Sequence, residues 1–268
     1  LVGSEMCIRD SIAPMVGGWL LVHASWHGIF WFLTGVGVFL WMANYFLLPE
    51  TLHVSQRQQF HIKNLMAGYW KLGSDPRFVL LALASGIPFN GMFLYVLSAP
   101  VFLGEHLGLQ PQQFFWFFVL TISGIMGGAF VSGRVAGKTS PKQQIRNGFL
   151  IMLIIGLLNL AANLAFKAHV SWALFPIAIF AFGWAMMVPV VTLLVLDLHP
   201  DRRGMASSLQ MFVGSTANGL VAGVVSPLVM HSTVALASAS VLMMCLGLCS
   251  WVFIRRRWPE IGQKVDVL

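Results

Sequence analysis

The stretch from Ser74 to Leu103, SDPRFVLLALASGIPFNGMFLYVLSAPVFL, contains an apolar segment from residue 78 to 103 without a charged side chain. A helix needs about 20 predominantly apolar residues to cross the hydrocarbon core of a bilayer, and this segment is long enough. Pro88 does not argue against a membrane helix, because neighbouring helices can satisfy the backbone groups that a proline frees. The stretch therefore predicts a transmembrane helix.

The same composition extends along the whole chain of 268 residues, of which 57% are hydrophobic and 9% are charged. An average soluble domain has about 25% charged residues, so a soluble protein of this composition could not cover its surface. Further full-length apolar segments run over residues 28–48, 114–133, 148–166, 172–196, 205–230 and 233–254. A shorter run, Ile12 to Val22, has only about half the length of a span. We therefore predict an all-α polytopic membrane protein with seven full transmembrane helices and part of another.

The basic residues are distributed unevenly over the loops between these segments. Fourteen of the sixteen Lys and Arg residues lie in loops on one side, whereas Lys167 is alone on the other. Cytoplasmic loops carry an excess of Lys and Arg, so the basic side and the C-terminus are expected in the cytoplasm. This distribution also accounts for the net charge of +7. No signature of a nucleic-acid-binding protein accompanies it, and no nucleic-acid partner is expected.

Enzyme, cofactor and metal-binding functions find no support in the sequence. GRVAGKTS, from Gly133 to Ser140, lacks a glycine that a phosphate-binding loop needs, because Ser132 stands there, and it follows a membrane segment instead of a strand. The eight histidines lie in loops or at segment ends and form no motif of zinc-binding spacing. We expect no catalytic residues, no metal and no cofactor. No full segment has a charged residue in its middle, so a proton-binding carboxylate is expected elsewhere.

Uncharged polar side chains do occur inside the apolar segments. They are Asn44, Asn90, Tyr95, Ser98, Thr121, Asn159, Asn163 and Asn218. One interpretation is hydrogen bonding between helices, worth roughly 0.6–2 kcal/mol for each bond. The other is the lining of a cavity for a bulky apolar solute, because aromatic residues lie close by in the segment that carries Asn90. Under that second interpretation the cavity candidates are Asn90, Phe93 and Asn218, with Phe89 and Tyr95 as additional residues.

Several fragments in a fixed order resemble the major facilitator superfamily, and more narrowly its bicyclomycin-resistance (Bcr/CflA) branch of drug:proton antiporters. The fragments are APMVGGWLL (13–21), WHGIFWFL (26–33), FLLPETL (46–52), the opening stretch, LGLQPQQFFWFF (107–118), GGAFVSGRVAGK (127–138) and HPDRRGMASSLQMF (199–212). The resemblance covers about residues 11–255. Members of this family have twelve helices in two six-helix halves, so the chain is expected to be a C-terminal fragment.

The resemblance implies a division of the chain into parts. Residues 11–49 end the N-terminal half, 50–77 form the cytoplasmic loop between the halves, 78–254 form the C-terminal half, and 255–268 form a cytoplasmic tail. Residues 1–10, LVGSEMCIRD, place Arg9 where the family has an apolar helix, so we expect this leader to be non-native. The N-terminal half of the same protein is the expected partner of the chain.

The function implied by the resemblance is export of small amphipathic drugs across the bacterial inner membrane, driven by inward proton flow. The fragment alone is expected to be inactive. Two sets of residues match family motifs for conformational change: Pro14, Gly17 and Gly18 in the first, and Gly128, Gly133, Arg134, Gly137 and Lys138 in the second. The alternatives are an importer of sugars or other metabolites, and a non-transporting membrane scaffold.

The charge distribution gives a test of orientation. Cysteines introduced as Gln110→Cys and Lys142→Cys lie in loops on opposite predicted sides of the membrane. An impermeant thiol reagent added to intact cells should label the first and leave the second unlabelled until the cells are opened. The reverse pattern of labelling would contradict the predicted topology.

Overall fold

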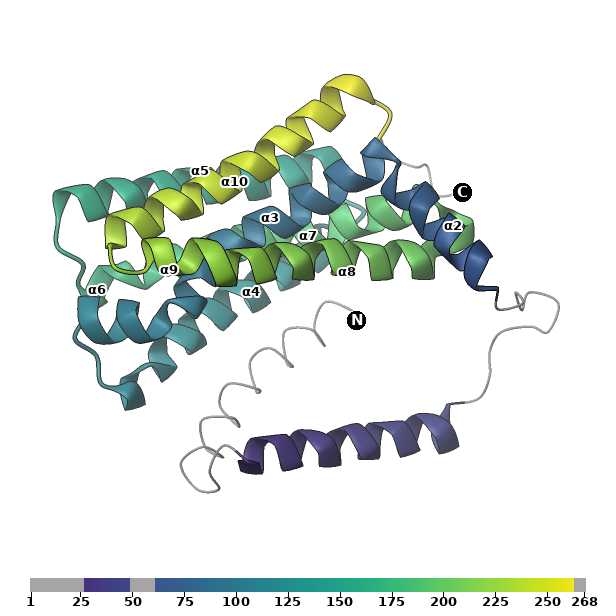
Figure 1. Ribbon diagram of the computed structural model, residues 1–268. Helices are drawn as coiled ribbons and strands as arrows, with labels where there is room; N and C mark the ends of the chain where they lie inside the picture. The colour runs from purple at the N-terminus through teal and green to yellow at the C-terminus, as the bar shows by residue number, and fades with distance from the viewer. Residues whose placement is uncertain (1–26, 49–60, 263–268) are drawn as a thin grey trace.

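The computed structural model describes residues 27–48 and 61–262, and these ranges contain helices and connections but no strand. The first helix, His27–Leu47, lies apart from the others (Figure 1). The remaining helices form one bundle. Their bounds are α2 Ile62–Gly73, α3 Pro76–Leu97, α4 Phe115–Val135, α5 Pro141–Ala165, α6 Val170–Ala173, α7 Phe175–Asp197, α8 Arg203–Leu220, α9 Ser226–Val229 and α10 Thr233–Arg257, with a π-helical segment η2 at Pro100–His106 and another, η5, at Val221–Val225.

Seven helical stretches within the described ranges are long and apolar enough to cross a membrane. They coincide with the seven apolar segments, so the predicted all-α membrane fold is confirmed. The short run Ile12 to Val22 lies outside the described residues, and so do the motif residues Pro14, Gly17 and Gly18.

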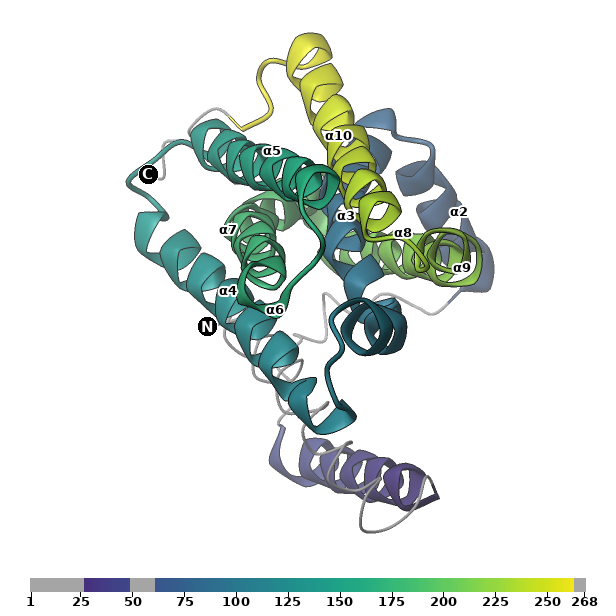
Figure 2. The same cartoon turned by 90° about the vertical axis from the view of Figure 1, so that its left-hand side faces the viewer.

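Helices α3 and α7 form the centre of the bundle. Of their most apolar windows, 56% and 44% of the residues are buried, more than in any other span that the structure describes. Figure 2 shows α7 between α4 and α5, and both of these helices pack along it. Helix α3 packs against α7 and also against α10, where Gly247 leaves room for the ring of Pro88.

Glycine residues allow α4 and α5 to approach the backbone of α7. A Cβ atom at Gly124 or Gly128 of α4 would collide with the carbonyl oxygens of Ala178 or Phe182. Helices in a membrane gain little from burying apolar surface against one another, so close van der Waals contact has to hold them together. The two glycines of α4 provide that contact.

Two parts of the helical structure differ from the apolar segments. Helix α5 begins at Pro141, well before residue 148, because Ser140 accepts a hydrogen bond from the Gln143 N–H and caps the helix. Polar first turns such as this one extend beyond an apolar span. Helix α2 lies within the stretch 50–77, which was predicted only as a loop. It packs on α8, where Gly68 contacts Met205.

A pair of glycines in α4 tests the role of this packing. Gly128→Ala should lower the free energy of unfolding by about 1–3 kcal/mol, because the added methyl group forces α4 away from α7. The matched control is Gly133→Ala in the same helix, where no atom lies within 4 Å of the added carbon. Denaturation in detergent micelles would measure both, and equal stabilities would contradict the packing interpretation.

Candidate functional site

Three aromatic side chains from α3 and α7 form one group, called here the aromatic cluster. Phe89 and Phe93 stack with their ring centroids 5.2 Å apart, and Phe89 lies 4.8 Å from Trp184. The Trp184 indole donates a hydrogen bond of 2.9 Å to the carbonyl oxygen of Ser85, which fixes the ring against α3. All three aromatic side chains are only half-buried, so part of each ring lies at the surface of the bundle.

A group of uncharged polar side chains lies beside this cluster, and we call it the polar seam. The Gln210 amide of α8 donates to the hydroxyl oxygens of Ser85 and Thr192, at 3.3 Å in both cases. The polar seam therefore connects α3, α7 and α8 at one point. Gln210 and Thr192 are half-buried, and Ser85 is buried.

Asn90 and Asn218 fall at the same level of the bundle. An ideal Cβ atom on Gly86 of α3 would lie 3.5 Å from the Cα of Gly214. The hydroxyl oxygens of Ser98 and Ser226 lie 3.1 Å apart. The residue numbers differ by 128 in both pairs, so the two stretches run in the same direction in constant register. Asn90 and Asn218 have the same offset and stand between these two pairs, one helical turn beyond the glycines.

Both asparagines have polar groups without a partner. The Asn90 amide nitrogen donates to the Gly86 carbonyl oxygen at 3.1 Å, whereas the Oδ1 atoms of Asn90 and Asn218 have no hydrogen-bond partner in the structure. A buried polar atom without a partner is costly, so such atoms are candidates for binding a ligand or a water molecule. The structure thus places two of the predicted cavity residues at a similar level along α3 and α8, each with an amide oxygen that has no partner.

Tyr95 lies in a different environment from the other predicted residues. Its hydroxyl oxygen accepts a hydrogen bond of 2.9 Å from Asn159 of α5, and its ring packs edge-on against Phe102 at 5.0 Å. The side chain is 2% exposed and lies inside the bundle. These contacts fit the first of the two interpretations that the sequence left open, namely hydrogen bonding between helices. The assignment of all five residues to a transport cavity stays a prediction.

The second motif occupies the end of α4. Gly128 contacts α7, Arg134 stacks on the ring of Phe130 at 4.4 Å, and Gly137, two residues after the helix, has a positive φ of 78°. Gly133 and Lys138 are exposed. The role of these residues in conformational change stays a prediction.

A neutral contact links the end of α4 to two other helices. Buried Gln144 of α5 donates to the Ser132 hydroxyl at 2.7 Å and to the Met186 carbonyl oxygen at 2.9 Å. One amide group therefore links α4, α5 and α7 without any charge. Neutral hydrogen bonds between membrane helices contribute about 1 kcal/mol each, so this link holds the helices with modest strength.

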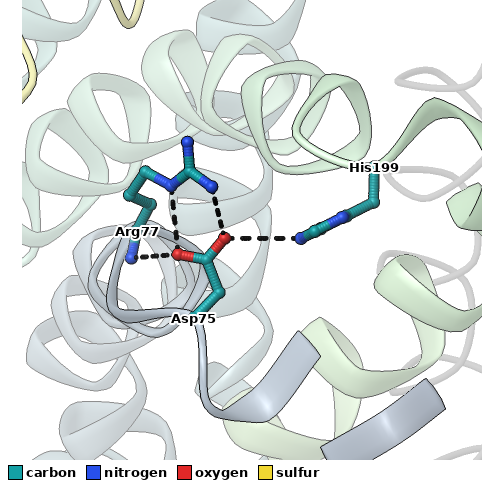
Figure 3. A network of polar contacts seen from close by, with 3 residues as sticks. All are labelled: Asp75, Arg77 and His199. Carbon is teal, nitrogen blue, oxygen red and sulfur yellow. Dashed lines mark hydrogen bonds and ion pairs between the residues drawn. The ribbon is translucent and has the colours of Figure 1, made fainter. Parts of the chain in front are cut away.

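An ion pair caps the start of α3, as Figure 3 shows. The Asp75 carboxylate accepts hydrogen bonds from the backbone N–H of Arg77 at 2.9 Å and from its guanidinium at 2.9 Å and 3.1 Å. His199, which follows α7, places its Nε2 atom 3.4 Å from Asp75. Burial would raise the pKa of Asp75, but the hydrogen bonds and charge of Arg77 outweigh it and hold the pKa below the usual 3.8.

Within residues 27–48 and 61–262, no three His, Cys, Asp or Glu side chains lie close enough to hold a metal ion. The polar seam and Trp184 were not singled out from the sequence. The high content of Ser, Thr, Gln and Asn in segment 205–230 was the available signal for Gln210. The partners of Gln210 are more than 15 residues distant in sequence, so only the fold identifies them.

Comparison with known proteins gives one family and several relatives. The family model for the Major Facilitator Superfamily matches residues 11–222. The uncharacterized MFS-type transporter YdgK of Bacillus subtilis is 27% identical over 96% of this chain and 63% of its own length. The bicyclomycin resistance protein homolog of Haemophilus influenzae is 24% identical over 79% and 54%, respectively. Multidrug resistance protein D of Escherichia coli is 26% identical over 99% and 66%. The chain thus spans between about half and two thirds of the length of these relatives.

Two variants of Asp75 separate its capping role from its charge. Asp75→Ala removes both and should lower the free energy of unfolding by about 1–2 kcal/mol at neutral pH. Asp75→Asn retains a capping oxygen and should lose less. Because the folded pKa of Asp75 is depressed, its charge stabilises the protein above pH 3.8, and this contribution is lost as the pH falls through the folded value.

The pH dependence is measured by denaturation in micelles between pH 7 and pH 3. Asp75→Asn should flatten this dependence relative to the wild type. Asp197→Asn is the matched control, because Asp197 pairs with Arg203 at 2.8 Å but is 52% exposed, and such pairs contribute about 0–1 kcal/mol. Identical pH profiles for wild type and Asp75→Asn would refute the assignment.

Proposed function

Because the chain belongs to the major facilitator superfamily, we propose that it comes from an exporter of small amphipathic compounds across the bacterial inner membrane. Two of the relatives described above carry names for bicyclomycin or multidrug resistance, and their similarity extends over most of this chain. Those names support export of drug-like compounds as the class of activity. In this proposal the basic loops and the C-terminus are cytoplasmic.

The observation that carries the proposal is the aromatic cluster next to the polar seam. Phe89, Phe93 and Trp184 offer flat apolar surface, and Gln210 offers an amide that can exchange partners. Aromatic rings bind flat apolar solutes without strict geometry, while a small number of polar groups orient them. No charged side chain belongs to either group. Such a surface suits amphipathic compounds of varied shape better than sugars, which require many hydrogen bonds.

Asn90 and Asn218 add two amide oxygens without partners at one level of the α3–α8 contact. In the proposed transporter they belong to the substrate cavity with Phe89 and Phe93. Tyr95 lies behind this surface and supports it, because its ring is inside the bundle and its hydroxyl contacts Asn159.

Proton coupling requires a group that binds and releases a proton inside the membrane. The acidic residues in the membrane-spanning stretches of residues 27–48 and 61–262 are Asp197 and Asp201, and both stand at the ends of their stretches. We therefore place the coupling carboxylate in the N-terminal half of the longer protein. The drug and the proton would then share a site between the two halves, which alternate by rocking against each other.

One substitution tests the cavity and is made in the full-length protein. Asn90→Leu should change the relative tolerance to different drugs, because it removes a polar group from the proposed cavity, while the amount of protein in the membrane stays constant. Asn44→Leu is the matched control, since Asn44 lies on the separate helix and its amide donates to the Leu40 carbonyl oxygen. Growth assays in a drug-sensitive bacterium, with immunoblots, measure both. A fall in protein level without a change in drug profile would support the packing role instead.

The same growth assay also tests the chain expressed alone. It should confer no tolerance, because one half presents an open face and carries no coupling carboxylate in its described spans. Co-expression with an authentic N-terminal half should restore part of the tolerance. Strong efflux by the chain alone would place the proton site within these 268 residues and refute this assignment.

A further inference from the structure

A pocket lies at the end of the bundle opposite α2, where α5 ends and α10 begins. Its volume is about 530 Å³, within the range of about 300–1,000 Å³ typical of small-molecule sites. The wall consists of Glu105 and His106 from η2, Asn163 and the following residues to Ala168 at the end of α5, and Thr233 at the start of α10. We call it the end pocket. It is separate from the aromatic cluster and the polar seam.

The end pocket contains two opposite charges that do not pair with each other. Glu105 and Lys167 both line it, and both side chains are exposed. Among the interactions of the described residues, neither takes part in an ion pair or a side-chain hydrogen bond. His106 is engaged differently, because its Nε2 atom lies 3.0 Å from the Met230 carbonyl oxygen. One negative and one positive group are therefore available to a ligand.

Two helix ends also lie at the pocket. The C-terminal end of a helix carries a partial negative charge and the N-terminal end a partial positive charge. Helix α5 brings its C-terminal end to the pocket at Ala165, and α10 brings its N-terminal end there at Thr233. The Asn163 side chain also lines the pocket, but its Oδ1 atom is buried and has no hydrogen-bond partner in the structure. Lys167 follows the end of α5 by two residues, and Glu105 adjoins His106, which contacts Met230 just before α10. Each charged side chain therefore lies near the helix end of opposite sign.

The rim of the end pocket is apolar and continues along the outer face of α5. Leu164 and Phe166 both line the pocket and are 68% and 70% exposed. Further along α5, Ile154, Leu157 and Leu158 are also exposed, and their spacing places them on the same side of the helix. In a membrane this stripe contacts acyl chains, so an apolar track leads directly to a dipolar pocket.

We propose that the end pocket binds the headgroup of a zwitterionic phospholipid of the phosphoethanolamine type, with the acyl chains along α5. Lys167 holds the phosphate, while Glu105 accepts hydrogen bonds from the ammonium group. A quaternary choline headgroup has no N–H to donate, so the ethanolamine lipid is preferred. The lipid belongs to the leaflet at the α6 end of the bundle, which the charge distribution predicts to be the outer one.

The test uses the full-length protein, purified and freed of lipid. Native mass spectrometry measures retention of phosphatidylethanolamine, phosphatidylcholine and phosphatidylglycerol with identical acyl chains. The ethanolamine lipid should be retained most strongly. Lys167→Met should weaken retention of both the ethanolamine and the glycerol lipid, whereas Glu105→Gln should weaken only the ethanolamine lipid. Each loss should be about tenfold, the effect of one charged hydrogen bond.

The controls are Lys63→Met on α2 and Glu260→Gln after α10, which remove the same charges far from the pocket and should leave retention unchanged. All four side chains are exposed, so thermal unfolding should show folded variants. Equal retention of the three lipids, or wild-type retention by both pocket variants, would overturn the proposal. Binding of glycerophosphoethanolamine as tight as that of the whole lipid would show a site for a soluble zwitterion and would overturn it too.

Discussion

The approach of α4 to the backbone of α7 sets the arrangement of the other helices. Inside a bilayer, burying apolar surface against another helix gains little over lipid, so helices associate where their backbones come within van der Waals contact. Gly124 and Gly128 meet this condition on α4, and Gly148 meets it on α5 opposite Gly183. Helix α7 is therefore held from two sides. Its position in turn directs Trp184 toward α3.

Two polar contacts inside the bundle are neutral and weak, and each connects three helices. Gln144 links α4, α5 and α7, and Gln210 links α3, α7 and α8. An ionic link in the same positions would bind the helices more strongly and would resist any change of arrangement. Amide and hydroxyl groups can exchange partners at low cost. A transporter that alternates between states needs contacts of this kind, so the neutral contacts of Gln144 and Gln210 fit the proposed function.

How much of the structure can be predicted from the sequence depends on how far apart in the sequence the interacting residues lie. The seven spans depend on the composition of continuous segments, so their number and approximate positions can be predicted, while helix ends such as Pro141 of α5 depend on capping groups outside the apolar segment. Helix α2 was missed because its turns are polar on one side and its stability depends on contacts with α8. Among site residues, Phe89 and Phe93 are four apart on one helix and could be grouped from sequence. Trp184 and Gln210 could not, because each contacts Ser85, which lies 99 residues from Trp184 and 125 residues from Gln210.

Helix α8 buries little of its surface against the rest of the bundle, and this has a consequence for biosynthesis. The span from Pro200 to Val229 has a mean hydropathy of 1.5, against 2.3 for the span that contains α7, and only 11% of its most apolar window is buried. A segment of this polarity gains little by entering lipid on its own. Helix α3 is synthesised more than 100 residues earlier and carries Ser85 and Ser98, which pair with Gln210 and Ser226. We therefore expect α3 to act as an intramolecular template that retains α8 in the bilayer as it leaves the insertion machinery.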